Sequence, residues 1–211
     1  MLYATQTRSR SGLTEMKRHG FGLLMTPESL KKNGPPVWLD NSTARFCIDN
    51  GAWSAYKNQT KYEVQPFLEL VDAFGQRSDF VILPDIVGGG IESLDFSLCF
   101  LELNTPRKLI AVQDGMTPND VRQYLSDSIG IAVGGTTEWK ENTLRSWGKL
   151  AAECVSYLHV LRVNTRRRLK LCHAAGANSI DGTSATRFPK TAALLSRWNR
   201  ELENQLSLEG M

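Results

Sequence analysis

The 211-residue sequence predicts an α/β fold, a compact single-domain (β/α)8 barrel of the TIM type. Three observations support this prediction. Eight short runs of apolar and β-branched residues recur along the chain, longer helical patterns separate most of them, and several runs end in Asp, Gln or Gly. The repeated unit is therefore strand, loop and helix, and a closed barrel needs eight such units.

The expected strands are short apolar runs bounded by turn residues, as buried strands usually are. They cover residues 2–5, 21–25, 46–49, 80–85, 109–114, 129–134, 157–163 and 179–181. Their spacing leaves room for a helix between most neighbouring pairs, as a barrel of parallel strands requires.

Helices are expected in most of the connections. Thr117 offers an N-cap and Pro118 the first helical position before residues 119–127, and residues 188–206 carry a long amphipathic pattern. Further helices are expected at residues 63–74, 91–103, 138–154 and 166–175. The first two connections look too short or irregular for full helices, so a doubly wound open sheet remains the alternative.

Composition limits the classes of protein to consider. The 41% hydrophobic content suffices for a buried core, and the length favours one domain over residues 1–211. A net charge of +3 permits a local basic patch without requiring one. The four cysteines are widely separated and no apolar leader is visible, so we expect a cytoplasmic protein. No run reaches the roughly 18 apolar residues of a membrane helix, and no membrane partner is expected.

Polar residues gather at the carboxyl ends of the expected strands, which converge on one face of a βα barrel. They are Asp49, Asp85, Gln113, Asp114, Gly134, Gly135, Asn164 and Asp181. The two glycines allow backbone amides to approach a planar ligand closely. Taken singly, these segments also fit ordinary turns and loop caps. The triple glycine at 88–90 lacks the spacing of a phosphate-binding fingerprint, so no nucleotide cofactor is expected there. We expect no other cofactor.

Three consecutive arginines, Arg166, Arg167 and Arg168, follow the seventh expected strand. They fall in the first turn of a helix, where the macrodipole disfavours each cation by roughly 0.3–1 kcal/mol. A phosphate group would relieve this conflict, because helix N-terminal amides and guanidinium groups both bind phosphate oxygens. We therefore expect these arginines to contact nucleic acid, and the alternative is a solvated basic helix face.

Two segments are distinctive, Gly-Gly-Thr-Thr-Glu-Trp at 134–139 and Ser-Ile-Asp-Gly-Thr-Ser at 179–184. Weaker ones are Ile48-Asp49-Asn50-Gly51, Leu83-Pro84-Asp85, Val112-Gln113-Asp114-Gly115 and the stretch from His159 to Arg168. In this order, the segments resemble those of the tRNA-guanine transglycosylase superfamily. The resemblance is closest to its DNA-modifying branch, the DNA guanine transglycosylases of phages and bacteria.

The resemblance implies an enzyme that exchanges guanine in DNA for a 7-deazaguanine derivative such as 7-cyano-7-deazaguanine. It implies Asp181 as the nucleophile, which forms a covalent aspartyl–sugar intermediate, and Asp49 as the general base. It also implies that Asp85, Gln113 and the backbone of Gly134 and Gly135 hold the edges of the purine. A pocket of carboxylate, amide and backbone groups suits guanine, which presents both donors and acceptors. The implied partners are DNA and the free base.

The chain departs from the tRNA enzymes of this superfamily in one respect. Those enzymes carry a structural zinc on three closely spaced cysteines and a histidine after the nucleophile, and no cysteine or histidine follows Asp181 here. Cys172 and His173 are adjacent and precede it, which is not a chelating pattern on a helix. No zinc is therefore expected. The alternatives left open are a zinc-less tRNA-guanine transglycosylase, a guanine-releasing nucleoside or DNA glycosidase, and a non-catalytic nucleic-acid-binding barrel.

Overall fold

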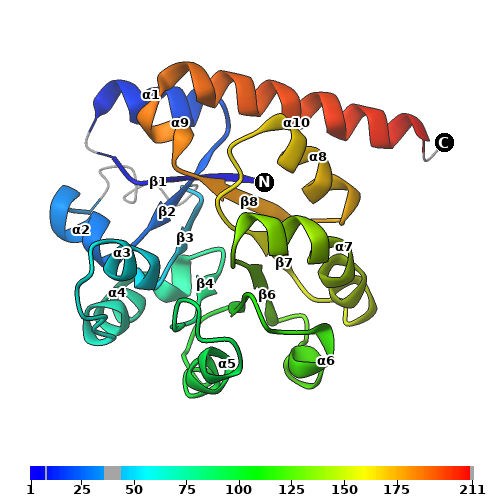
Figure 1. Cartoon of the computed structure of the whole chain (residues 1–211). Coiled ribbons are helices and arrows are strands. Elements are labelled where there is room, and N and C mark those ends of the chain that lie inside the picture. Colours follow the sequence, from blue (N-terminus) through cyan, green and yellow to red (C-terminus); the bar gives the residue numbers. More distant parts are fainter. Residues whose placement is uncertain (8, 36–43, 210–211) are drawn as a thin grey trace.

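Eight parallel strands form a closed barrel in the computed structural model, which describes residues 1–7, 9–35 and 44–209 (Figure 1). The strands are β1 (Leu2–Thr5), β2 (Gly22–Met25), β3 (Phe46–Ile48), β4 (Val81–Ile82), β5 (Lys108–Val112), β6 (Ile129–Val133), β7 (Leu158–Val160) and β8 (Ser179–Gly182). Their order around the barrel is their order in the chain, and β8 pairs with β1, Tyr3 lying opposite Asp181. This closure confirms the predicted (β/α)8 barrel and excludes the open sheet.

The first two connections contain helices, contrary to the expectation. They are α1 (Arg10–Arg18) and α2 (Pro27–Asn33). Ser9 caps α1 by accepting the N–H of Gly12, and Thr26 forms a capping box with Ser29 at the start of α2. These helices have only nine and seven residues, so their apolar pattern is too short to recognise in the sequence. Their capping residues are the sequence feature that could have predicted them. Residues 36–43, in the second connection, lie outside the described part of the chain.

The later helices include the six predicted ones, in order, and two short helices that were not predicted. They are α3 (Ala52–Lys57), α4 (Gln65–Phe74), α5 (Ile91–Leu98), α6 (Pro118–Val121), α7 (Thr137–Glu153), α8 (Arg166–Ala174), α9 (Ser184–Arg187) and α10 (Pro189–Glu209), with 3-10 turns η2 (Gly75–Arg77) and η3 (Arg122–Tyr124). The two that were not predicted are α3 and α9. The helix expected at 119–127 is only α6 followed by η3, and α5 ends five residues before the expected position 103. The C-terminal helix α10 lies across the outside of the barrel against α1, α8 and α9 (Figure 1).

The core has two layers because strand side chains alternate between the two faces of the sheet. The outer layer, which includes Ile48, Val133 and Val160, packs under the helices. The inner layer fills the barrel with Tyr3, Leu24, Cys47, Phe80, Ile82, Leu109, Ala111 and Ala132. The carboxyl ends of the strands, here called the mouth of the barrel, carry Asp49, Asp85 and Asp181. Within the described residues, no helix combines the length and apolar character that a membrane span requires.

Candidate active site

Asp181 lies on β8 and is almost fully buried, with 6% of its surface exposed. Its Oδ1 accepts a hydrogen bond of 3.0 Å from the backbone N–H of Arg162. The same oxygen lies 3.4 Å from Nε2 of His159, an approach without hydrogen-bond geometry. His159 is wholly buried on β7, and its Nδ1 lies 2.8 Å from Oγ of Ser179. The bond from Arg162 therefore orients the Asp181 carboxylate through Oδ1, and none of the side-chain hydrogen bonds among the described residues engages Oδ2.

Asp49 directly follows β3 and is partly buried at the mouth. The pKa of Asp49 is raised to about 7, mainly by burial and also by the charges of Asp181 and Asp85. Hydrogen bonds from the backbone N–H groups of Gly51 and Asn50 oppose this rise. A carboxyl group with such a pKa is part protonated and part ionised at neutral pH. It can therefore both donate and accept a proton, as a general acid and base must.

Asp85 stands beside the loop that carries Asp49. Asn50, which is 2% exposed, donates from Nδ2 to Oδ1 of Asp85 at 2.9 Å and to the carbonyl of Leu83 at 2.6 Å. Burial raises the pKa of Asp85 to about 6, although the Asn50 bond and the charge of Arg162 oppose the rise. Asn50 was not expected as a site residue, yet it joins the β3 and β4 loops at the mouth.

The positively charged side chain of Arg162 lies near Asp49, Asp85 and Asp181. One of its guanidinium nitrogens donates to the backbone carbonyl of Gly135, and the guanidinium lies 4.2 Å from the ring centroid of Trp53. Burial lowers the pKa of Arg162, whereas the charges of Asp181, Asp49, Asp85 and Asp114 raise it. The side chain thus bridges the loops that follow β6 and β3. Arg162 is not among the predicted site residues, since the sequence pattern drew attention only to the three consecutive arginines at 166–168.

Gln113 and Asp114 hold neighbouring loops. Gln113 donates from Nε2 to the carbonyl of Ile86 at 2.8 Å and to Oγ of Ser93 at 2.7 Å, and its Oε1 accepts the N–H of Gly88 at 2.6 Å. The carboxylate of Asp114 accepts the backbone N–H and the hydroxyl of Thr136, both at 2.6 Å. Both side chains therefore fix the shape of the mouth in this conformation.

The remaining expected residues also lie at the mouth. The N–H of Gly134 donates to the carbonyl of Val112 at 2.8 Å. Gly135 has φ +69°, and a Cβ there would lie 2.5 Å from Oδ2 of Asp114, so a larger residue would disturb this turn. Asn164 accepts the N–H of Ser184 through Oδ1 at 3.1 Å. The structure therefore brings Asp49, Asp85 and Asp181 together around Arg162, and the other expected residues brace the surrounding loops.

The three arginines of α8 pair with carboxylates of the chain itself. Arg166 contacts Glu201 of α10 at 2.9 Å, and Arg167 and Arg168 contact Glu141 of α7 at 2.6 and 3.1 Å. These ion pairs offset the unfavourable placement of cations at a helix N-terminus. The guanidinium-bearing side chains of Arg166 and Arg167 remain 50% and 76% exposed, so both can still meet an external anion.

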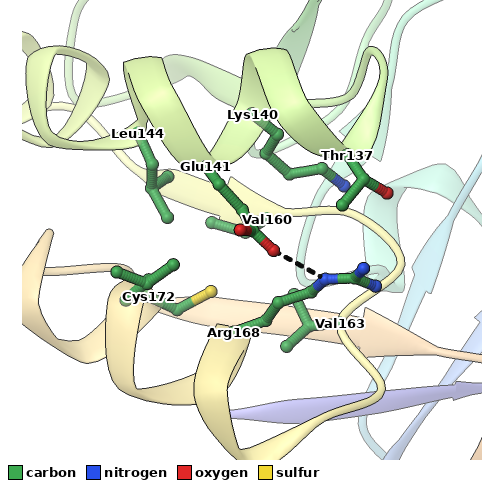
Figure 2. Close-up of a pocket in the computed structure, with 9 residues that line it drawn as sticks. Thr137, Lys140, Glu141, Leu144, Val160, Val163, Arg168 and Cys172 are labelled. Atoms are coloured by element: carbon green, nitrogen blue, oxygen red, sulfur yellow. Dashed lines mark hydrogen bonds and ion pairs between the residues drawn. The ribbon is translucent and has the colours of Figure 1, made fainter.

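A cavity between α7 and α8 is lined by Lys140, Glu141, Leu144, Arg168 and Cys172, among others (Figure 2). Its volume of about 10 Å³ is no more than a single water molecule needs. It is therefore a packing gap beside the mouth and not a substrate pocket. Among the residues that the structure describes, no group of three or more His, Cys, Asp or Glu side chains could hold a metal ion.

Comparisons with known proteins support the fold and no specific activity. No family model and no curated protein matches the chain. A solved structure described as "Native KDPGal structure" is 12% identical, with 96% of each chain covered and a TM-score of 0.59. A cube-shaped, highly porous protein cage designed by fusing symmetric oligomeric domains is 11% identical, with 99% of this chain and 75% of that chain covered and a TM-score of 0.62. At such identities the likeness concerns the barrel alone.

Proposed function

We propose that this chain is an enzyme, a DNA guanine transglycosylase that replaces guanine with a 7-deazaguanine derivative. One observation carries the proposal: Asp49, with a pKa raised to about 7, stands at the mouth within electrostatic reach of the buried Asp181. Two neighbouring carboxyl groups in different surroundings can divide the roles of nucleophile and acid/base catalyst. The resemblance of both segments to the transglycosylases supports the same division.

The reaction consists of two displacements at the anomeric carbon of the target nucleotide. In the first, Oδ2 of Asp181 attacks this carbon, the bond to guanine breaks with its electron pair going to the base, and Asp49 gives a proton to the departing guanine. In the second, Asp49 removes a proton from the incoming base, which attacks the same carbon and releases the carboxylate of Asp181. The configuration of the sugar is retained.

Substrate binding must engage or displace Arg162. Its guanidinium already contacts the carbonyl of Gly135 and one face of Trp53. In a substrate complex, the carbonyl could accept a hydrogen bond from the exocyclic amine of the purine, and the Trp53 face could stack on the purine ring. Asp85, held by Asn50, offers a further acceptor or donor to the base. Since a paired base cannot reach a barrel mouth, the target must be flipped out or single-stranded.

The proposal is tested by mass spectrometry of nucleosides from DNA of cells that express the chain and can make 7-deazaguanines. We expect a 7-deazaguanine deoxynucleoside with the wild-type chain and none with Asp181→Asn. Abasic sites without a modified nucleoside would indicate the guanine-releasing glycosidase, and modification confined to tRNA would indicate the tRNA enzyme. Unmodified nucleic acid together with tight DNA binding would indicate the non-catalytic barrel.

A further inference from the structure

Lys140 of α7 is a buried cation, with only 6% of its surface exposed. Its Nζ donates a hydrogen bond to the backbone carbonyl of Leu161, an acceptor without formal charge. The neighbouring carboxylate, Glu141, is paired with Arg168 (Figure 2) and with Arg167. Burying an ammonium group is costly unless other charges or hydrogen bonds compensate it, so this placement calls for a reason.

The carbonyl that Lys140 binds belongs to the same peptide group as the N–H of Arg162. That N–H donates to Oδ1 of Asp181 at 3.0 Å. A cation that donates to the oxygen of a peptide group polarises it and makes its N–H a stronger donor. One planar group thus links the ammonium of Lys140 to the carboxylate of Asp181.

The backbone at the Leu161–Arg162 peptide group has an unfavourable conformation. Arg162 has φ +60°, in the left-handed region that costs a non-glycine residue roughly 1–2 kcal/mol. Lys140 fixes the oxygen side of the peptide group and Asp181 the nitrogen side. The conformation that directs the N–H toward Asp181 is therefore stabilised from both sides.

We propose that Lys140 is a positioning residue, which holds the Leu161–Arg162 peptide so that its N–H orients the carboxylate of Asp181 for attack on the sugar. The inference rests on the proposed function only for the attack itself. The contact between Lys140, the peptide and Asp181 is a property of the fold.

The charges around Lys140 determine when it is protonated. The pKa of Lys140 is lowered to about 8, mainly by burial and also by the charges of Arg162 and Arg168, whereas the charge of Asp181 opposes this lowering. Glu141, the remaining carboxylate beside it, is neutralised by its arginines. The ammonium and its effect on Asp181 are thus present below pH 8 and are lost as the pH rises through this value.

The first experiment needs no enzymatic activity. Titration of the Lys140 side chain by NMR should give a midpoint near 8, and Asp181→Asn should lower it by roughly 0.5–1 pH unit, because a nearby negative charge is removed. Asp85→Asn is the matched control and should leave the midpoint unchanged. A midpoint near the ordinary lysine value, or one that Asp181→Asn does not move, would overturn the proposal.

The second experiment measures the reaction. In single-turnover mixing with guanine-containing DNA, Lys140→Met should slow formation of the covalent adduct about 10- to 100-fold with unchanged affinity for guanine, and Lys140→Arg should recover most of the rate. Equal losses of affinity and rate in both variants would contradict a positioning role. If Lys140→Met does not fold, the adduct rate of Lys140→Arg and the NMR titration test the positioning role.

If the wild type forms no adduct, the proposed function is wrong, and the NMR titration still tests the link between Lys140 and Asp181.

Discussion

Asp49, Asp85 and Asp181 share the mouth of the barrel with the guanidinium of Arg162, and the ammonium of Lys140 lies near Asp181. Two cations do not balance three carboxylates, and burial disfavours charge, so at least one carboxyl group is held partly protonated. Asp49 is this group, since its pKa is raised to about 7 by burial and by the charges of Asp181 and Asp85. The proton that a departing base requires is thus already in place at neutral pH.

Asp181 and Asp49, the proposed nucleophile and acid/base catalyst, should lose different steps of the reaction when each is changed to asparagine. Asp181→Asn should abolish both base exchange and any covalent enzyme–DNA adduct, because an amide is a far poorer nucleophile. Asp49→Asn should keep substrate binding and lose about 10²–10⁴-fold in exchange rate, the usual effect of removing an acid/base group. Denaturing gel electrophoresis detects the adduct. An adduct that persists in Asp181→Asn and is absent in Asp49→Asn would reverse the assignment.

The raised pKa of Asp49 predicts opposite pH dependence for the two half-reactions. Adduct formation uses the protonated carboxyl group, so its rate should fall as the pH rises through about 7. Resolution of the adduct by an added base uses the ionised form, so its rate should rise over the same interval. Rapid-mixing measurements between pH 5 and 9 provide the comparison. Parallel pH profiles for the two steps would remove Asp49 from proton transfer.

The sequence predicts the aspartates of the mouth, and not the cations that organise them. Asp49, Asp85 and Asp181 follow or end apolar strands, and the convergence of strand ends in a barrel then places them together. Arg162 is recognisable only from its positive φ and its contact with Trp53. Lys140 lies on a helix and acts through a backbone carbonyl, a relation that no residue spacing reveals.

Among the helices, α8 carries three arginines in its first turn, and each pairs with a carboxylate of a neighbouring helix. The strands could be predicted because a short run of apolar, β-branched residues is visible in the local sequence. The ion pairs to Glu141 and Glu201 could not be predicted, because their partners lie 27 and 35 positions apart in sequence. The arginines therefore have two candidate roles, stabilising the contacts of α8 with α7 and α10, and binding the phosphates of DNA. An experiment must distinguish these roles.

Two matched variants distinguish these roles for Arg166. Arg166→Ala should weaken DNA binding and flatten its dependence on salt, because each phosphate contact releases counterions. Glu201→Gln removes the partner of Arg166 and leaves the cation free, so DNA binding should stay equal or become tighter. Fluorescence anisotropy at several salt concentrations measures both. Unchanged binding in Arg166→Ala, with both variants equally less stable, would reduce Arg166 to an anchor between α8 and α10.

At the scale of the whole molecule, the raised pKa of Asp49 should make folding less favourable at neutral and alkaline pH. The folded protein holds this proton up to about pH 7 and the unfolded chain only to its ordinary value of 3.8, so stability is lost as the pH rises between these values. Asp49→Asn should therefore raise the free energy of unfolding at pH 8 by up to about 4 kcal/mol. Urea unfolding of both proteins at pH 8 and pH 4 provides the test, and at pH 4 the difference should be much smaller. A variant that is less stable than the wild type at pH 8 would contradict the assigned pKa.

Exchange of guanine in DNA is measured with radiolabelled guanine. Purified chain is incubated with the labelled base and either guanine-containing DNA or tRNA, and the polymer is recovered and counted. We expect time-dependent incorporation into DNA, none into tRNA, and none into DNA with Asp181→Asn, since the label enters only through the ester on Asp181. Absence of label in DNA under conditions where the wild-type chain binds that DNA would contradict the proposed exchange.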